Sequence, residues 1–367
     1  MNDHRLDPKD PGSHGRFIAD DLGILMGEGS HQRTGKKARA SLPVPTDVLP
    51  EEPTYYGQPM LKPPVWVWSV PVYFYVGGTA GAALTLAAAA QSVDRFALRG
   101  LIGSCRWIGV LGISAGSALL IWDLGYKRRF LNMLRVFRPT SPLNVGTWLL
   151  ASGGSLSGAA ALLTNSSGFL RTAGDVAGRA AGLVGMPLAG YTGVVLADTA
   201  VPAWQEARRM LPVLFIGSAM AGTASLLELL DLKPNEEAVA RRFGILGKTA
   251  ALAATVVMER EACRVERVAR PFRQGLSGTL WKVAKTLSAA SLLLSVLPGK
   301  SKRKHQAAGV LGSLGALAIR FAVFEIGRQS GRDPRATFEM QRAGHGAAEV
   351  TAKPLSPPEH TMAGAPL

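Results

Sequence analysis

The side chains of this sequence that could do chemistry are a few ionisable and polar aromatic residues placed within or beside long apolar segments. Asp123, Asp198 and Glu325 lie near the ends of such segments, and Tyr191 lies inside one. A charge in hydrocarbon is costly, so an embedded carboxylate tends to face a polar cavity or a partner, where it can relay protons. These three carboxylates are therefore candidates for proton transfer, and Tyr191 is a candidate hydrogen-bond donor. Two alternatives stay open, because Asp123 could cap or pair with the basic loop beside it and Tyr191 could bond a neighbouring carbonyl.

Aromatic residues crowd the start of the first long apolar segment. That segment carries no charged residue from Val65 to Ala90. At about 1.5 Å of rise per residue it crosses a hydrocarbon core of about 30 Å. Trp66, Trp68 and Tyr73 lie at its entrance, and amphipathic rings of this kind settle at headgroup depth. They are interface anchors or, alternatively, part of a binding site.

The sequence offers little for a resident redox group or metal. It has two cysteines, Cys105 and Cys263, and none of its six histidines lies inside a predicted span. A membrane b-type haem usually needs axial histidines at membrane depth, and iron–sulfur clusters need a set of thiolates. We expect no haem, no iron–sulfur cluster and no metal in this chain. Since the GxxxxGK[ST] and HExxH patterns are also absent, we expect any catalytic power to come from a partner.

Eight apolar segments are predicted to form the membrane helices that position these residues: 65–90, 101–122, 145–163, 180–197, 211–230, 238–258, 276–297 and 307–326. The expected fold class is an all-α polytopic membrane protein, with about eight transmembrane helices in two four-helix bundles at 55–204 and 205–328. A polar, flexible N-terminal tail, 1–54, and a polar C-terminal tail, 329–367, flank them. Glycines four apart at 77/81, 112/116 and 154/158 predict close helix packing in the first bundle.

Composition supports a membrane protein and excludes some partners. Mean hydropathy is +0.15, and 47% of residues are hydrophobic. The formal net charge of +15 comes from Lys and Arg in short tracts between apolar segments, which is typical of cytoplasmic loops and not of nucleic-acid binding. An even number of spans puts both termini on one side, and the more basic loops share it. We therefore expect a multi-pass protein of the bacterial inner membrane with both termini in the cytoplasm.

Three stretches of the sequence are the most distinctive: YYGQPMLKPPVWVWSVPVYFYVGG at 55–78, DLGYKRRFLNMLRVFRPTSPLNVGTW at 123–148 and MPLAGYTGVVLADTAVPAW at 186–204. Together they resemble the NrfD/PsrC family, the integral-membrane subunits of polysulfide-reductase-like complexes, in its shorter YYG-type branch. In one departure from the family, Tyr126 and Lys127 stand where its members often have Arg and Pro.

The resemblance implies two four-helix bundles without a cofactor of their own and a site for exchangeable quinone or quinol. It also implies a neighbouring four-cluster-type iron–sulfur protein that exchanges electrons with a molybdopterin oxidoreductase. Onto this sequence it carries Asp123, Tyr191 and the first-span entrance, with Trp66, Trp68 and Tyr73, as the quinone region.

We therefore expect a membrane anchor subunit that exchanges electrons between the quinone pool and a docked iron–sulfur subunit. Two other classes stay open. Lys248, Arg320 and Glu325 lie inside predicted spans, so the chain could be an ion or small-solute transporter. It could also be a purely structural anchor.

Overall fold

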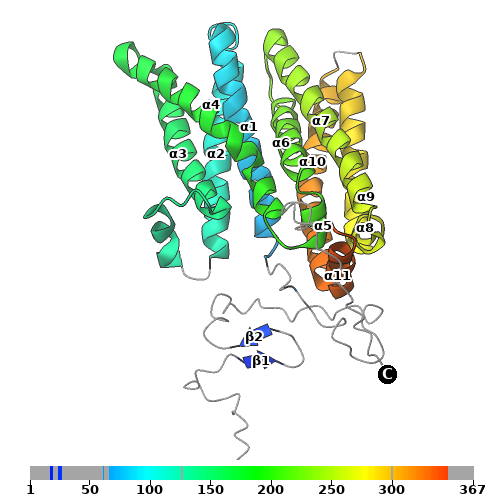
Figure 1. Ribbon diagram of the computed structural model, residues 1–367. Helices are drawn as coiled ribbons and strands as arrows, with labels where there is room; N and C mark the ends of the chain where they lie inside the picture. Colours follow the sequence, from blue (N-terminus) through cyan, green and yellow to red (C-terminus); the bar gives the residue numbers. More distant parts are fainter. Residues whose placement is uncertain are drawn as a thin grey trace, which may run out of the picture.

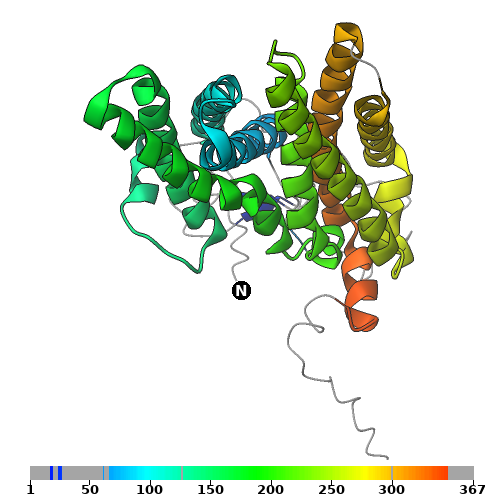
Figure 2. The same ribbon diagram turned by 90° about the horizontal axis from the view of Figure 1, so that it is seen from above.

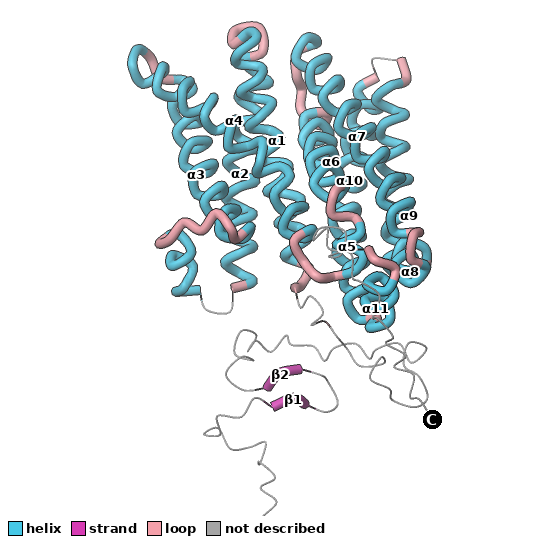
Figure 3. The backbone as a smooth tube through the Cα atoms, viewed as in Figure 1, coloured by secondary structure: helices cyan, strands magenta, loops and turns pink. Residues whose placement is uncertain are grey.

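The computed structural model describes residues 17–19, 24–26, 61, 66–124, 127–298 and 301–345, and this part of the chain is almost entirely helical (Figures 1 and 3). Its eight long helices correspond one to one with the predicted spans: α1 (Ser69–Asp94), α2 (Arg99–Asp123), α3 (Pro142–Leu162), α4 (Gly168–Ala197), α6 (Met210–Leu227), α7 (Pro234–Ala262), α9 (Gly275–Val296) and α10 (Lys302–Arg332). Shorter helices connect or follow them: η3 (Lys127–Leu134), η4 (Leu163–Asn165), α5 (Pro202–Glu206), α8 (Glu266–Arg273) and α11 (Pro334–Arg342).

Two short strands depart from the all-helical expectation. β1 (Phe17–Ala19) and β2 (Ile24–Met26) pair antiparallel within the segment that the sequence predicted to be a flexible tail. Both are apolar triplets, and a polar DDLG stretch separates them in the sequence. Apolar and aromatic residues favour paired strands, which explains why these two triplets pair.

Five of the long helices, α1, α2, α4, α6 and α10, are long and apolar enough to cross a membrane. Bulky apolar side chains on their outer surfaces, such as Leu111, Leu183 and Leu314, are exposed, as a lipid-facing surface requires. The chain is therefore an all-α polytopic membrane protein. Helices α3, α7 and α9 are not among these five, so their membrane crossing stays a prediction.

The long helices form two groups that stand side by side (Figures 1 and 2). The first group is α1 to α4, and the second is α6, α7, α9 and α10; they meet where α1 and α4 pack on α6 and where α1 packs on α10. We call the end where α1 begins and α10 ends the terminus face. It also carries α5, α8 and α11, and the opposite end is the far face.

Close helix contacts occur at only some of the predicted glycines. A Cβ on Gly81 would lie 2.7 Å from the backbone nitrogen of Ala189 in α4, and a Cβ on Gly112 would lie 2.8 Å from the backbone oxygen of Val76 in α1. No larger residue fits at either position without moving a backbone. The third pair is different, because a Cβ on Gly158 would meet nothing within 4 Å. The expectation of close packing is therefore wrong for Gly158.

The C-terminal region is more structured than predicted. Helix α10 continues to Arg332, and Asp333 then caps α11 by accepting hydrogen bonds from backbone amides. Ala336 and Met340 of α11 are buried. Arg267 of α8 pairs with Asp333 at 3.4 Å. Because these contacts hold α11 in place, packed structure extends beyond residue 328, where the sequence predicted a polar tail.

Candidate functional site

The first-span entrance lies at the junction of the two helix groups on the terminus face. The ring of Trp66 stacks on Trp204 and Phe324, with centroids 6.2 and 6.3 Å apart, and meets the edge of Phe74 at 6.4 Å. Trp204 is itself buried and donates its indole hydrogen to the Val323 carbonyl at 2.9 Å. Trp66 is thus packed against α1, α5 and α10 at once.

Trp68 lies apart from these rings. Its side chain is 59% exposed just before α1 begins. An exposed tryptophan at the end of a membrane helix is typical of a headgroup anchor. The two tryptophans of the entrance therefore occupy different environments, and only Trp66 borders the interior.

Tyr73 is the most informative residue of the entrance. It is 3% exposed, and its ring lies where α1 and α2 approach, because a Cβ on Gly116 would be 3.2 Å from its Cδ2. Its hydroxyl is buried and has no hydrogen-bond partner within the described residues. An unpaired buried hydroxyl costs about 1–3 kcal/mol. Such a group is a candidate donor to a bound ligand.

Tyr191 lies at a similar depth but faces a different helix. Tyr73 follows the first residue of α1 by four positions and Tyr191 precedes the last residue of α4 by six, which places them about 6 and 9 Å from the terminus-face ends of their helices. The Tyr191 ring packs on α3, where a Cβ on Gly146 would lie 2.1 Å from its Cε2. Tyr73 therefore lies at the contact between α1 and α2, and Tyr191 lies at the contact between α4 and α3.

The three candidate carboxylates all lie on the terminus face but do not form one cluster. Asp123, the last residue of α2, accepts a hydrogen bond from Ser69 of α1 at 3.5 Å, so it borders the first-span entrance. Asp198 is exposed at the end of α4. Glu325 pairs with Arg328 on its own helix at 3.3 Å. Of the three, Asp123 lies beside the start of α1, the helix that also carries Tyr73.

A buried arginine adds to this region and was not predicted as part of the site. Arg320 of α10 is 1% exposed, and its guanidinium carbon lies 3.8 Å from the ring centroid of Phe215. Its Nη2 donates to the Phe215 carbonyl at 2.9 Å, whereas its Nε and Nη1 have no partner within the described residues. Phe215 contacts Phe74 at 6.0 Å, and Phe74 contacts Tyr73 at 5.7 Å. The signal in the sequence is an arginine inside an apolar segment, but only the fold shows that it joins these rings.

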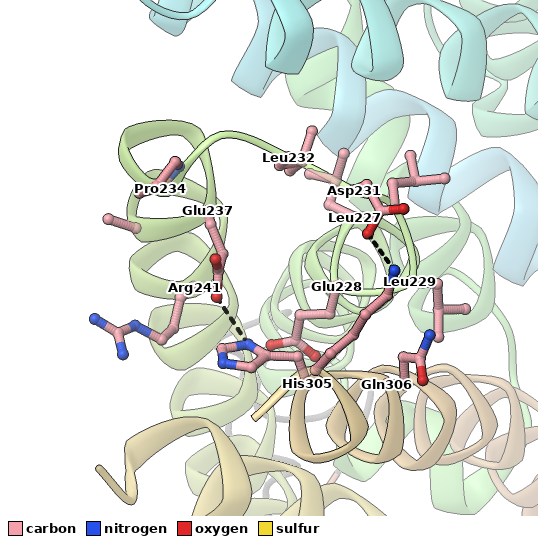
Figure 4. Close-up of a pocket in the computed structure, with 13 residues that line it drawn as sticks. Leu227, Glu228, Leu229, Asp231, Leu232, Pro234, Glu237, Arg241, His305 and Gln306 are labelled. Atoms are coloured by element: carbon pink, nitrogen blue, oxygen red, sulfur yellow. Dashed lines mark ion pairs between the residues drawn. The ribbon is translucent and has the colours of Figure 1, made fainter. Parts of the chain in front are cut away.

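A second buried charge cluster lies toward the far face. Lys248 of α7 is 1% exposed and contacts Glu228 at 3.2 Å and Ser295 Oγ at 2.8 Å. Ser295 also donates to Glu228 at 3.1 Å. Glu228 lines a pocket of about 360 Å³, at whose rim Asp231 pairs with Lys302 at 2.7 Å (Figure 4).

Arg106, in contrast, has a structural role. It donates to the Ala160 carbonyl at 3.1 Å, to Thr164 at 2.8 Å and to Gln91 at 2.9 Å. It also lies 3.6 Å from Asp175. Since these partners belong to α1, η4, α3 and α4, Arg106 joins the helices of the first bundle near the far face.

These features define the class: an integral membrane protein with two helix groups and buried polar side chains where they meet. Residues 58–166 match the model of the family described as Polysulphide reductase, NrfD. The similarity to NrfD proteins is therefore confirmed for the region from the first-span entrance to the end of α3, which includes Trp66, Tyr73 and Asp123. No curated protein matches the chain.

Proposed function

We propose that this chain is the membrane subunit of a redox complex, in which it exchanges electrons between the quinone pool and a docked iron–sulfur subunit. The match to the NrfD family supports this proposal, because members of that family are membrane subunits of quinone-linked redox complexes. The iron–sulfur subunit would in turn exchange electrons with a molybdopterin oxidoreductase. The membrane is the bacterial inner membrane, with both termini in the cytoplasm.

The observation that carries the quinone site is the hydroxyl of Tyr73, which lies in the family-matched region, is buried and has no hydrogen-bond partner among the described residues. A quinone carbonyl is an acceptor of the kind this hydroxyl lacks. The rings of Phe74 and Trp66 beside it offer an apolar surface for a flat headgroup. Tyr191, at similar depth, is the second proposed donor, and Trp68 marks the headgroup level at which the isoprenoid tail enters.

Protons and electrons need separate routes. Asp123 is the proposed proton carrier nearest the headgroup, because Ser69 connects it to the start of α1. Asp198 and Glu325 are proposed to exchange protons with water at the terminus face. Quinone is the exchangeable redox group, and it supplies the electron chemistry when bound. The partner's nearest cluster docks on the terminus face, so that a headgroup beside Tyr73 comes within tunnelling reach.

The test compares two conservative variants. Tyr73→Phe and Tyr191→Phe each keep the ring and remove one hydroxyl, which should weaken quinone binding by about 1 kcal/mol, or about fivefold. The measurement is quinol-dependent reduction of the partner's clusters in membranes, normalised to assembled complex. A raised quinone requirement with normal assembly supports the site. Unchanged quinone dependence in both variants removes both tyrosines from it.

A further inference from the structure

Buried polar side chains extend from Arg320, in the middle of α10, toward the far-face pocket. The first of these side chains, starting from Arg320, belong to α1 and α10. The Tyr75 side chain interacts electrostatically with Arg320 and lies near Ser313, which is about two turns closer to the far face on α10. The hydroxyl of Ser313 is buried beside Tyr75, and two N–H groups of Arg320 have no hydrogen-bond partner within the described residues. Donors without acceptors thus begin at the junction of the two helix groups.

The next groups lie between α1, α6 and α10. Thr79 Oγ1 is buried and has no hydrogen-bond partner among the described residues. It lies against Gly222, where a Cβ would be 2.9 Å away. Ser225, about one turn further along α6, is fully buried, and its hydroxyl also has no hydrogen-bond partner within the described ranges. A Cβ on Gly312 would lie 2.1 Å from Ser225 Oγ and 2.7 Å from Ser291 Oγ. The two serine hydroxyls therefore flank a position that has no side chain.

The final groups connect this position to the far-face pocket. Ser295 follows Ser291 by one turn of α9, and its hydroxyl oxygen lies 2.9 Å from the backbone carbonyl oxygen of Ser291. Ser295 Oγ is also 2.8 Å from Lys248 and 3.1 Å from Glu228. Glu228 then lines the pocket. We call the side chains of Arg320, Ser313, Thr79, Ser225, Ser291, Ser295, Lys248 and Glu228 the polar track.

The physical chemistry of the polar track points to water. Buried hydroxyls and guanidinium N–H groups are almost always hydrogen-bonded, and ordered water supplies the bond where protein does not. Ionisable residues at membrane depth usually face an aqueous cavity and mark ion or proton pathways. Water and hydroxyl groups in a row can pass a proton by exchanging covalent and hydrogen bonds.

We propose that the polar track is a hydrated path that carries protons between the far-face pocket and the rings beside Arg320. A proton from water at the far face binds the Glu228 carboxylate and then passes along water and hydroxyls toward Phe215, Phe74 and Tyr73. That the protons are used at these rings rests on the proposed function. Reduction of a quinone there takes two electrons from the partner's cluster and two protons, and oxidation of a quinol returns both.

The groups that set the charge around Glu228 come from three elements. Lys248 faces it from α7. The other charged residues of the pocket lie on the loop after α6, on α7 and on α10: Asp231, Glu237, Arg241, Lys302 and His305. Figure 4 shows the His305–Glu237 and Asp231–Lys302 pairs at the pocket, with 3.0 and 2.7 Å between their closest atoms. Behind this rim, the buried Glu228–Lys248 pair is the next charged group along the polar track.

The first experiment tests the path without any quinone turnover. Ser225→Cys, in a Cys263→Ser background, places a thiol on the polar track, and the probe is Ag⁺, a small thiol-reactive cation. Ala224→Cys is the matched control, because Ala224 is equally buried but packs against Gly244 of α7. The protein is reconstituted in vesicles, exposed to Ag⁺ on one side and denatured, and the remaining free thiol is counted by mass spectrometry.

We expect far-face Ag⁺ to block the thiol of Ser225→Cys at least tenfold faster than that of Ala224→Cys. We also expect terminus-face Ag⁺ to be slower than far-face Ag⁺ on the same variant. Equal rates for Ser225→Cys and Ala224→Cys, or faster reaction from the terminus face, would overturn the path. Cys105, buried in α2, provides a second thiol off the track in every sample.

The second experiment tests proton transfer in the assembled complex. A pH dye on the far side of vesicles records the protons exchanged per quinol turned over. We expect Ser225→Ala and the charge-free double variant Glu228→Gln/Lys248→Gln to slow the far-side signal at least fivefold, whereas Thr286→Ala, an exposed hydroxyl on α9, leaves it unchanged. A wild-type complex that turns over quinol without a far-side signal, or an undiminished far-side signal in both variants, contradicts the proposal. If the wild-type complex turns over no quinol, the proposed function fails, and the Ag⁺ rates still decide whether the path exists.

Discussion

Removing the hydroxyl of Tyr73 should have opposite effects on stability and on ligand affinity. This hydroxyl is buried and has no hydrogen-bond partner in the part of the chain that the structure describes. Burying an unpaired hydroxyl costs about 1–3 kcal/mol, and Tyr73→Phe removes that cost while keeping the ring contacts with Gly116 and Phe74. The ligand-free protein should therefore gain about 1 kcal/mol or more in unfolding free energy. If quinone accepts a hydrogen bond from Tyr73, the same variant should bind quinone about fivefold more weakly.

The assay is unfolding of purified protein in detergent, followed by tryptophan fluorescence and repeated over a series of quinone concentrations. Without quinone, Tyr73→Phe should unfold at higher denaturant or temperature than wild type. With increasing quinone, wild type should gain stability from ligand binding at lower concentrations, so the difference shrinks or reverses. Loss of stability in the ligand-free variant would refute the reasoning, because it would mean that the hydroxyl is hydrogen-bonded within the protein.

Three further predictions concern packing and buried charge. Gly146→Ala should lower the unfolding free energy by about 1–3 kcal/mol, since the added methyl overlaps the Tyr191 ring, and thermal unfolding should show no such loss in a Tyr191→Ala background. Lys248→Met should lower the unfolding free energy by about 3–5 kcal/mol, because it leaves the Glu228 carboxylate without its cation. The double variant Lys248→Met/Glu228→Gln should recover most of this loss, and equal losses in the single and double variants would contradict the pairing. Glu236→Ala should cost about 1–2 kcal/mol and speed hydrogen exchange of the Leu101 amide, because this amide donates a hydrogen bond to Glu236 Oε1 at 3.0 Å; unchanged exchange would contradict it.

The helices were predictable where hydropathy alone decides them. The second predicted span, 101–122, differs from α2 by two residues at its start and one at its end. The fourth was placed at 180–197, but α4 begins at Gly168, because Arg171, Asp175 and Arg179 are polar and yet helical. Asp175 explains part of this extension, since it pairs with Arg95 at 2.8 Å. A hydropathy pattern finds the part of a helix that faces lipid and misses turns that continue into water or are held by ion pairs.

The candidate site was predictable in composition but not in arrangement. The aromatic entrance and Asp123 were evident from sequence patterns, and the fold brings Asp123 to Ser69. Nothing in the sequence distinguishes Tyr73, whose hydroxyl has no partner among the described residues, from a tyrosine that bonds a carbonyl. The difference depends on which helix packs against the side chain. For the same reason, the rings that connect Arg320 to the entrance became evident only when α1, α6 and α10 were seen to meet.

The most direct test of the central claim is cluster reduction in the native complex with and without this chain. Membranes from cells that contain or lack the subunit are given a quinol, and the iron–sulfur clusters of the partner are followed by electron paramagnetic resonance, normalised to the amount of partner present. If the chain exchanges electrons with the quinone pool, quinol reduces the clusters only when the chain is present, and a chemical reductant reduces them in both samples. Equal quinol-driven reduction in membranes that lack the chain would contradict the account.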